Sequence, residues 1–196
     1  MNKTIEYYET NAREYFEETV VIDVNELYER FLKYIPVAGK IVDIGCGSGR
    51  DMKAFKLRGY QVEGIDASAE MCGLARQFTE EKVICEDINS WNPDEKYNGI
   101  WACASLLHLN NDDISAFFNK AKEYLEPGGV IFVSAKNGIR TGEAADGRYF
   151  TDFNEEFINR ILSENNEYQL MELWYTSDTL DRNDFRWLSF IIKMKN

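Results

Sequence analysis

The chain contains the run Asp43-Ile44-Gly45-Cys46-Gly47-Ser48-Gly49-Arg50-Asp51, which completes a short β-branched segment that starts at Lys40. Such a segment is typical of a buried strand, and glycines at every second position after it permit a sharp turn. A glycine turn lets the backbone approach a ligand closely and leaves amide groups at the start of the next helix able to donate hydrogen bonds. We therefore expect residues 40–44 to form a strand that delivers a ligand-binding turn.

Strand-like and helix-like segments alternate beyond this turn. β-rich runs predict further strands at 61–65, 82–85, 99–103 and 130–134. Helical periodicity predicts helices at 52–57, 68–78 and 114–125. Because each crossover is long enough to hold a helix, we expect these strands to pair mostly in parallel.

The two ends of the chain extend this pattern. Two N-terminal helices are predicted, the second starting at a capping box of Asp23 and Glu26. A long polar segment at 136–149 is expected to be functional or mobile, and a helix at 154–163 follows it. Strands are also predicted at 169–175 and 186–194. Because the connection between them is too short for a parallel crossover, we expect an antiparallel hairpin. The predicted fold class is α/β, a doubly wound, mostly parallel seven-stranded sheet with a C-terminal antiparallel hairpin and N-terminal helices.

The composition and charge of the chain limit the classes of partner and of cellular environment that we expect for it. The chain has 196 residues and a formal net charge of −12, which fits one acidic domain, as a monomer or homodimer. Its field repels phosphate backbones and anionic lipids, so we expect neither a nucleic-acid nor a membrane partner. The four cysteines are irregularly spaced, no apolar leader is present, and no apolar run approaches the roughly 18 residues of a membrane span. These features predict a reduced, cytoplasmic protein.

Acidic residues follow the next two predicted strands. Asp66 lies about 20 residues beyond the glycine turn, where a carboxylate accepts the hydroxyl hydrogens of a ribose. Asp87 and Ile88 follow the third strand and are suited to the adenine amino group and ring. These strand ends together predict an adenosine site. The third glycine comes one position early for the G-x-G-x-x-G spacing of a pyrophosphate binder, which disfavours NAD.

The pattern Asp43-x-Gly45-x-Gly47-x-Gly49 resembles the first motif of class I S-adenosylmethionine-dependent methyltransferases. Within them the chain is most similar to small tellurite-resistance or thiopurine-methyltransferase-like enzymes. The resemblance spans nearly the whole chain and is carried by Tyr7-Tyr8-Glu9-Thr10-Asn11-Ala12, Gly47-Ser48-Gly49-Arg50-Asp51, Gly64-Ile65-Asp66-Ala67-Ser68, Trp101-Ala102-Cys103-Ala104-Ser105-Leu106-Leu107-His108 and Leu125-Glu126-Pro127-Gly128-Gly129.

The resemblance implies a Rossmann-like fold and transfer of a methyl group from S-adenosylmethionine to a small molecule by in-line displacement. It divides the chain into a helical cap (1–36), a cofactor-binding half (37–135) and a substrate loop with the hairpin (136–196). Two alternatives stay open: a regulatory module that binds S-adenosylmethionine without turnover, and a methyltransferase for metalloid or chalcogen compounds.

The cofactor-binding residues implied by the resemblance are Tyr15, Asp43, Gly45, Cys46, Gly47, Gly49, Arg50, Asp66, Ala67, Ser68, Met71, Asp87, Ile88, Cys103, Ala104 and Ser105. The turn at 45–49 would wrap the methionine part, Asp66 the ribose, and Asp87 with Ile88 the adenine. The backbone at Cys103 and Ala104 would face the sulfonium.

His108 is the candidate catalytic residue. It is the sole histidine and follows the fourth strand, and an imidazole suits proton removal near neutrality. The alternative is that it caps the next helix or contacts the cofactor without transferring a proton. Residues 104–107 lack the Asn- or Asp-Pro-Pro-aromatic motif of enzymes that methylate adenine or cytosine amino groups, which argues against a nucleic-acid base as acceptor.

Substrate recognition is expected from the long segment and the C-terminal hairpin, at Arg140, Arg148, Tyr149, Arg186 and Trp187, with Phe150 and Arg182 beside them. A cluster of arginines in an acidic protein favours a carboxylate or another oxyanion on the substrate. Structural ion pairs to Asp146, Asp152 or Asp181 explain these arginines about equally well. The spacing of carboxylates and histidine suggests no metal. Cys46 and Cys103 end adjacent strands, so their sulfurs are either a soft metalloid site or ordinary buried packing.

Overall fold

A computed structural model describes residues 2–177 and 185–195 and shows one seven-stranded sheet. Its order is β3-β2-β1-β4-β5-β9-β8. The strands are β1 (Lys40–Ile44), β2 (Gln61–Asp66), β3 (Val83–Cys85), β4 (Tyr97–Cys103), β5 (Leu125–Asn137), β8 (Tyr168–Thr176) and β9 (Arg186–Met194). Strands β1 to β5 pair in parallel, whereas β9 is antiparallel to both β5 and β8. The predicted fold class is confirmed.

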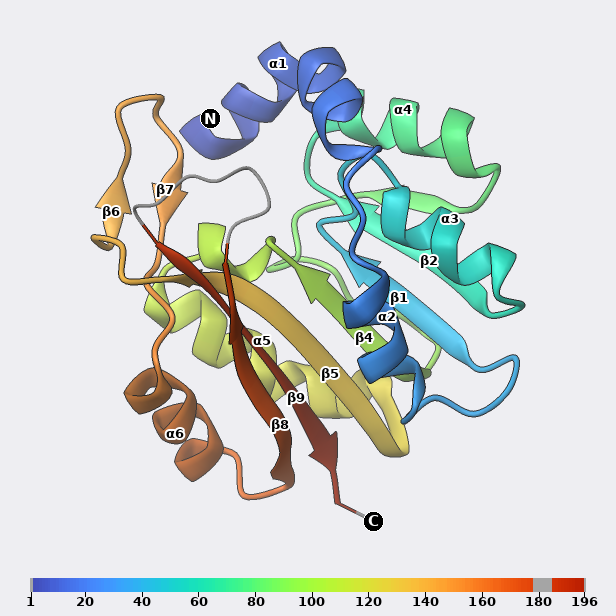
Figure 1. Cartoon of the computed structure of the whole chain (residues 1–196), viewed down its shortest axis with the longest axis vertical. Coiled ribbons are helices and arrows are strands. Elements are labelled where there is room, and N and C mark those ends of the chain that lie inside the picture. The colour runs from blue at the N-terminus through green and yellow to red at the C-terminus, as the bar shows by residue number, and fades with distance from the viewer. Residues whose placement is uncertain (1, 178–184, 196) are drawn as a thin grey trace.

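Helices cover both faces of the sheet (Figure 1). They are α1 (Lys3–Thr19), α2 (Asn25–Leu32), α3 (Arg50–Leu57), α4 (Ala69–Thr79), the 3-10 helix η1 (Leu106–His108), α5 (Asn111–Tyr124) and α6 (Glu155–Glu164). Successive strand residues alternate between the faces. Ile41 belongs to a core cluster that includes residues of α2, α3 and α4, whereas its neighbour Val42 belongs to a second cluster that includes residues of α5 and α6. Both faces of the central strands are therefore buried, as expected where helices flank a parallel sheet.

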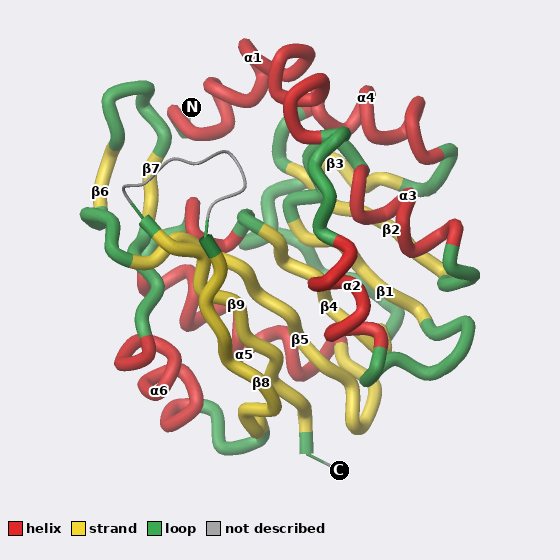
Figure 2. Tube along the Cα trace, viewed as in Figure 1, coloured by secondary structure: helices red, strands yellow, loops and turns green. Residues whose placement is uncertain are grey.

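The order of the strands fixes where a ligand can bind. The chain moves from β1 outward to β2 and β3 and then returns to place β4 on the other side of β1 (Figure 2). Ligands of open α/β sheets bind beyond the carboxyl ends of the strands at such a reversal. The turn at 45–49 and the segment after Cys103 both lie at this point.

Two further elements cover this edge of the sheet. Helix α1 crosses it and is kinked at Asn11, whose φ of −108° and ψ of 15° are not helical (Figure 1). A two-stranded hairpin of β6 (Gly142–Glu143) and β7 (Tyr149–Phe150) stands beside α1. The backbone N–H of Tyr149 donates to Oγ1 of Thr4 over 2.9 Å and holds the two together.

Some local predictions were wrong. No capping box starts α2, because Val24 occupies the N-cap position and Asp23 instead accepts from the backbone N–H of Asn25. Strand β5 starts at Leu125, directly after α5, rather than at residue 130. The segment 136–149 is partly ordered as the β6–β7 hairpin, which its sequence did not predict. Asp181 and Arg182 lie outside the described residues. Within the described part of the chain, no helix has both the length and the apolar character needed to cross a bilayer.

Candidate active site

The glycine turn after β1 has the backbone geometry that its sequence predicts. Gly45, Gly47 and Gly49 have φ values of 66°, 50° and 75°, in the left-handed region that favours glycine. A Cβ at Gly45 would lie 2.5 Å from Cβ of Ser105, so the turn and the segment after β4 pack too closely for a side chain. A Cβ at Gly49 would instead meet Thr79 at 2.7 Å, so this glycine serves the packing of α3 on α4.

Asp66, at the end of β2, ties the turn to the next strand. Its Oδ2 accepts from the backbone N–H of Gly47 and its Oδ1 from that of Ser68, both over 2.9 Å. Burial raises the pKa of Asp66, while these backbone hydrogen bonds oppose the rise. Each carboxylate oxygen has a second lone pair, so Asp66 retains acceptor capacity for two hydroxyl groups.

The strand-end carboxylates open into one cavity of about 140 Å³, here called the first cavity. Asp66 and Asp87 both line it, and Asn89 holds Asp87 in place through a backbone N–H bond to Oδ1 of 2.9 Å. Apolar residues complete the wall: Ile5, Ile44, Ile65, Met71, Ile88, Leu106 and Leu109. The site thus combines an apolar slot with a few converging polar groups, as small-molecule sites do.

A larger cavity of about 580 Å³, the second cavity, adjoins the first. Both cavities are lined by the same junction residues, namely Tyr8, Tyr15, Gly45, Gly47, Cys103, Ala104 and His108. The junction therefore lies between β1 and β4 at the point where the strand order reverses. A group carried in the first cavity can meet one held in the second at this junction.

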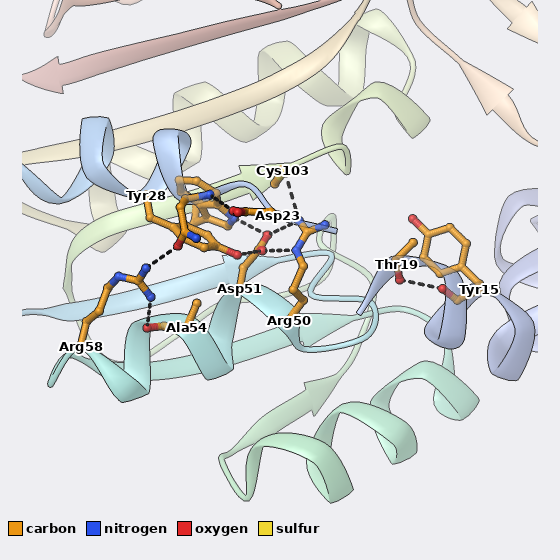
Figure 3. Close-up of polar contacts among 11 residues, drawn as sticks. Tyr15, Thr19, Asp23, Tyr28, Arg50, Asp51, Ala54, Arg58 and Cys103 are labelled. Carbon is orange, nitrogen blue, oxygen red and sulfur yellow. Dashed lines mark hydrogen bonds and ion pairs between the residues drawn. The ribbon is translucent and has the colours of Figure 1, made fainter. Parts of the chain in front are cut away.

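Arg50 and Asp51 form a buried cluster on the wall of the second cavity (Figure 3). Nε and Nη2 of Arg50 donate to the two oxygens of Asp51 over 2.6 and 3.0 Å, and Nη2 also contacts the sulfur of Cys103 at 3.8 Å. Asp51 further accepts from the hydroxyl of Tyr28 and from Nε1 of Trp101. Burial alone would raise the pKa of Asp51, but the Arg50 charge and these hydrogen bonds lower it below its usual range.

His108 is fixed from both sides of its ring. Nδ1 lies 2.8 Å from the carbonyl oxygen of Tyr149 and Nε2 lies 2.9 Å from the hydroxyl of Tyr8. Burial lowers the pKa of His108 to about 4, and the Arg148 and Lys136 charges act in the same direction. The ring is therefore neutral at physiological pH.

The second cavity has a cationic and aromatic wall. The guanidinium of Arg148 lies 4.2 Å from the ring centre of Tyr7 and 5.2 Å from that of Phe150, and Nζ of Lys136 lies 4.3 Å from the ring centre of Phe150. Arg148 also pairs with Asp146 over 2.6 Å. Acidic residues line other parts of the same cavity: Glu18, Asp23, Glu26 and Asp51.

The structure brings together most of the predicted site residues. Those that line the first cavity are Tyr15, Gly45, Gly47, Asp66, Ala67, Ser68, Met71, Asp87, Ile88, Cys103, Ala104, Ser105 and His108. Those that line only the second are Cys46, Arg50, Arg148 and Trp187, together with Phe150. Five predicted residues line neither cavity: Asp43, Gly49, Arg140, Tyr149 and Arg186.

Each of those five has another place in the fold. Asp43 is buried behind the turn, and burial, followed by the negative charge of Asp51, raises its pKa well above the usual range. Arg140 is exposed, and Arg186 lies over the ring of Tyr175 at 4.4 Å. Tyr149 acts through its backbone, which bonds His108 and Thr4.

The residue at the junction that the sequence analysis missed is Tyr8. Tyr8 and Tyr15 are seven residues apart, two helical turns, and this spacing on one helix face was the available signal. Their rings meet edge to face with centres 5.0 Å apart. Lys136 was also missed, since nothing in its sequence position distinguishes the end of β5 from an ordinary strand end.

The two cysteines at the strand ends face different surroundings. Cys46 belongs to the core cluster with Met52 and Phe55, and its sulfur lies against Gly64. Cys103 faces Arg50, and burial raises the pKa of its thiol to about 12. Among the residues that the structure describes, no group of three or more His, Cys, Asp or Glu side chains is arranged to hold a metal ion.

Comparisons with known proteins agree with this geometry. Residues 41–129 match a family described as "Methyltransferase domain". The chain is 31% identical over 103 residues to the ubiquinone biosynthesis O-methyltransferase of Bradyrhizobium sp. (strain ORS 278), which covers 50% of this chain and 40% of the relative. It is 30% identical over 129 residues to alpha N-terminal protein methyltransferase 1 of Arabidopsis thaliana, covering 58% and 47%. The chain thus spans less than half the length of these curated relatives.

Solved structures show the same fold. The 1,6-didemethyltoxoflavin-N1-methyltransferase of Burkholderia thailandensis, crystallised with S-adenosylhomocysteine, superimposes with a TM-score of 0.77 at 15% identity, over 98% of this chain and 85% of that one. TehB of Haemophilus influenzae gives a TM-score of 0.72 at 19% identity, over 96% and 67%. The chain is thus similar to methyltransferases in two respects: residues 41–129 match a methyltransferase domain, and its fold is that of an enzyme crystallised with S-adenosylhomocysteine.

Proposed function

We propose that this chain transfers a methyl group from S-adenosylmethionine to a small-molecule acceptor by in-line displacement. The observation that carries the proposal is the convergence of Asp66, Asp87 and the glycine turn on one cavity that opens into a second. The first cavity would hold the adenosine and the second the acceptor. The junction between them is the place for the transfer, because an enzyme of this kind mainly has to align the reacting atoms and exclude water.

The residues of the first cavity fit the cofactor. Asp66 would accept both ribose hydroxyls, Asp87 the adenine amino group, and Ile88 would cover the ring. Oγ of Ser105 is buried in this wall without a hydrogen-bond partner among the described residues, which indicates a site completed by a ligand. Arg50, which lines the second cavity beside the junction residue Cys103, would take the methionine carboxylate. When bound, the cofactor supplies a methyl group on a positively charged sulfur.

The acceptor that suits the second cavity carries a carboxylate or another oxyanion. Arg148 and Lys136 provide the positive charge, and Phe150 and Trp187 provide apolar surface beside it. A chalcogen compound is compatible with the same wall. The acidic residues of the second cavity lie on other elements than Arg148 and Lys136. The charges of this cavity are therefore also compatible with an acceptor that carries a cationic group besides its oxyanion.

The binding claim is tested by isothermal titration with S-adenosylmethionine. Wild-type protein should bind with micromolar affinity and Asp66→Ala should abolish the heat of binding. Asp94→Ala removes an exposed carboxylate outside both cavities and should bind as the wild type does. A wild-type protein that does not bind would refute the central proposal.

Turnover separates an enzyme from a regulatory module. A screen of metabolites with methyl-labelled S-adenosylmethionine should give a labelled product that depends on Arg148. Binding without label transfer to any acceptor would instead favour a module that senses the cofactor.

We also propose a cytoplasmic location and a monomeric or homodimeric state. The four free cysteines and the acidic balance support a reducing compartment. Cell fractionation tests the location, and light scattering on the purified protein tests the oligomeric state.

A further inference from the structure

The hydrogen bonds of His108 fix its tautomer. A carbonyl oxygen can only accept, so the short contact between Nδ1 and the carbonyl of Tyr149 places the ring hydrogen on Nδ1. Nε2 of the neutral ring is then an acceptor, and the hydroxyl of Tyr8 must donate to it over 2.9 Å. The basic nitrogen of His108 is therefore already occupied by a residue of the protein.

The charges that face His108 oppose its protonation. Burial has the largest effect and lowers the pKa of His108, whereas the hydrogen bond to the carbonyl of Tyr149 raises it. Arg148, in the loop of the β6–β7 hairpin, and Lys136, on β5, lower it further. Asp146 acts in the opposite direction, and its ion pair with Arg148 offsets part of the Arg148 charge. From α1, Tyr8 presents only its neutral hydroxyl. A proton delivered to His108 would thus create a third positive charge beside the cations Arg148 and Lys136 in a half-buried site.

Tyr8 is no better suited to take up a proton. Its hydroxyl hydrogen is committed to His108, and burial raises its pKa although the contact with Arg148 opposes the rise. What Tyr8 does have is position, because it lines both cavities and packs edge to face against Tyr15 and His108. Tyr8 and His108 therefore hold the junction in place and do not form a proton relay.

We propose that His108 is a positioning residue that holds Tyr8 at the junction, and that the acceptor enters with its nucleophilic atom already ionised. This rests on the proposed methyl transfer. The acceptor class is then a thiol, an acidic phenol or enol, or an oxyanion, and not an alcohol or an amine that must lose a proton in the site. The field of Arg148 and Lys136 favours the anionic form of such a group.

The step balances without a base. The anionic atom forms a bond to the methyl carbon while the carbon–sulfur bond breaks and leaves its electron pair on sulfur. No proton is transferred, and the negative charge of the acceptor and the positive charge of the sulfonium disappear together.

Nuclear magnetic resonance tests the role of His108 without any turnover, because a protein labelled with ¹⁵N-histidine reports one residue. We expect a neutral ring with hydrogen on Nδ1 from pH 5.5 to 8.5, with and without S-adenosylhomocysteine. Tyr8→Phe should shift the Nε2 resonance, whereas Tyr175→Phe, outside both cavities, should not. A ring that titrates near its ordinary pKa of about 6.5, hydrogen on Nε2, or an Nε2 signal indifferent to Tyr8→Phe would each overturn the proposal.

The ionised acceptor is tested with 4-nitrophenol, whose absorbance distinguishes phenol from phenolate. Bound to wild-type protein loaded with S-adenosylhomocysteine, its pKa should fall by about one unit or more. The fall should shrink in Arg148→Gln, persist in His108→Gln, and be unchanged in Arg13→Gln, an exposed arginine of α1. An unchanged or raised pKa, or no saturable binding, would overturn the proposal. Failure to bind S-adenosylhomocysteine, by contrast, would refute the methyl-transfer function and leave the His108 result standing.

Discussion

The backbone N–H of Gly47 donates to Oδ2 of Asp66 over 2.9 Å, so the turn after β1 is held by the carboxylate that ends β2. The two strands are parallel neighbours, and their carboxyl ends meet at the same edge of the sheet. One side chain therefore both shapes the glycine turn and presents acceptor atoms to the first cavity. The proposed cofactor site is pre-formed by this bond.

Asp66→Asn separates charge from size at this position. An amide has one acceptor oxygen, so it cannot keep both backbone hydrogen bonds and still receive two ribose hydroxyls. Loss of charge-assisted bonds worth about 1.5–3 kcal/mol should weaken cofactor binding roughly 10- to 100-fold. Isothermal titration measures the change, with Asp94→Asn as the matched control. Equal affinity in Asp66→Asn and the wild type would mean that Asp66 does not contact the ribose.

Gly45→Ala tests the geometry of the turn. Gly45 has a φ of 66°, and an added Cβ would lie 2.5 Å from Ser105, so strain and overlap should destabilise the fold by about 2–4 kcal/mol and weaken cofactor binding. Gly73→Ala is the control, because Gly73 lies in α4 with open space around its Cα and should gain about 0.5–1 kcal/mol. Urea unfolding gives both values. A neutral Gly45→Ala would show that the turn tolerates a side chain.

The strand ends that line the first cavity could be predicted from the sequence because their signals are local. Glycines after a β-branched strand and acids at the next strand ends each lie within a few residues of the element that positions them. Parallel pairing then brings these ends together without further information. The motif position of Gly49 does not predict its contact with Thr79, which lies thirty residues away in the sequence.

The acceptor side could not be predicted in the same way, because its contacts are distant in sequence. Tyr8 meets His108 across 100 residues, and Tyr149 meets Thr4 across 145. No local sequence pattern in the segment 136–149 predicts a hairpin that packs on α1. Arg140 and Arg148 are equivalent in sequence, yet only Arg148 lies on the cavity wall. The composition predicted a cluster of arginines for the substrate but could not show which arginine faces the cavity.

The Asp51 cluster should contribute strongly to stability. Asp51→Ala leaves the half-buried guanidinium of Arg50 without its carboxylate and should cost about 3–5 kcal/mol. Tyr28→Phe removes one donor to the same carboxylate and should cost about 1–3 kcal/mol. Chemical denaturation at neutral pH measures both. Tyr175→Phe loses a hydrogen bond near the surface and should change stability by less than about 0.5 kcal/mol. Similar values for all three variants would mean that the Asp51 cluster contributes no more to stability than a hydrogen bond at the surface does.

Asp43→Asn should show the opposite dependence on pH from Asp51→Asn. Burial, and then the charge of Asp51, raises the pKa of Asp43 in the folded state, so the folded protein keeps a proton that the unfolded chain has lost. Stability therefore falls as the pH rises from the unfolded pKa, about 3.9, towards the folded one. Asparagine neither titrates nor brings a charge, and Oδ2 of Asp43 has no hydrogen-bond partner among the described residues to lose.

The variant should match the wild type near pH 4 and become more stable above it, by up to about 1.4 kcal/mol for each pH unit between the two pKa values. Urea unfolding between pH 4 and 8 measures the difference, with Asp94→Asn as the control for removing a carboxylate at the surface. Asp51→Asn should behave in the reverse sense, because the folded pKa of Asp51 is lowered and its contribution is lost as the pH falls. A loss of stability in Asp43→Asn that is the same at every pH would show instead that Asp43 is ionised and paired in the folded protein.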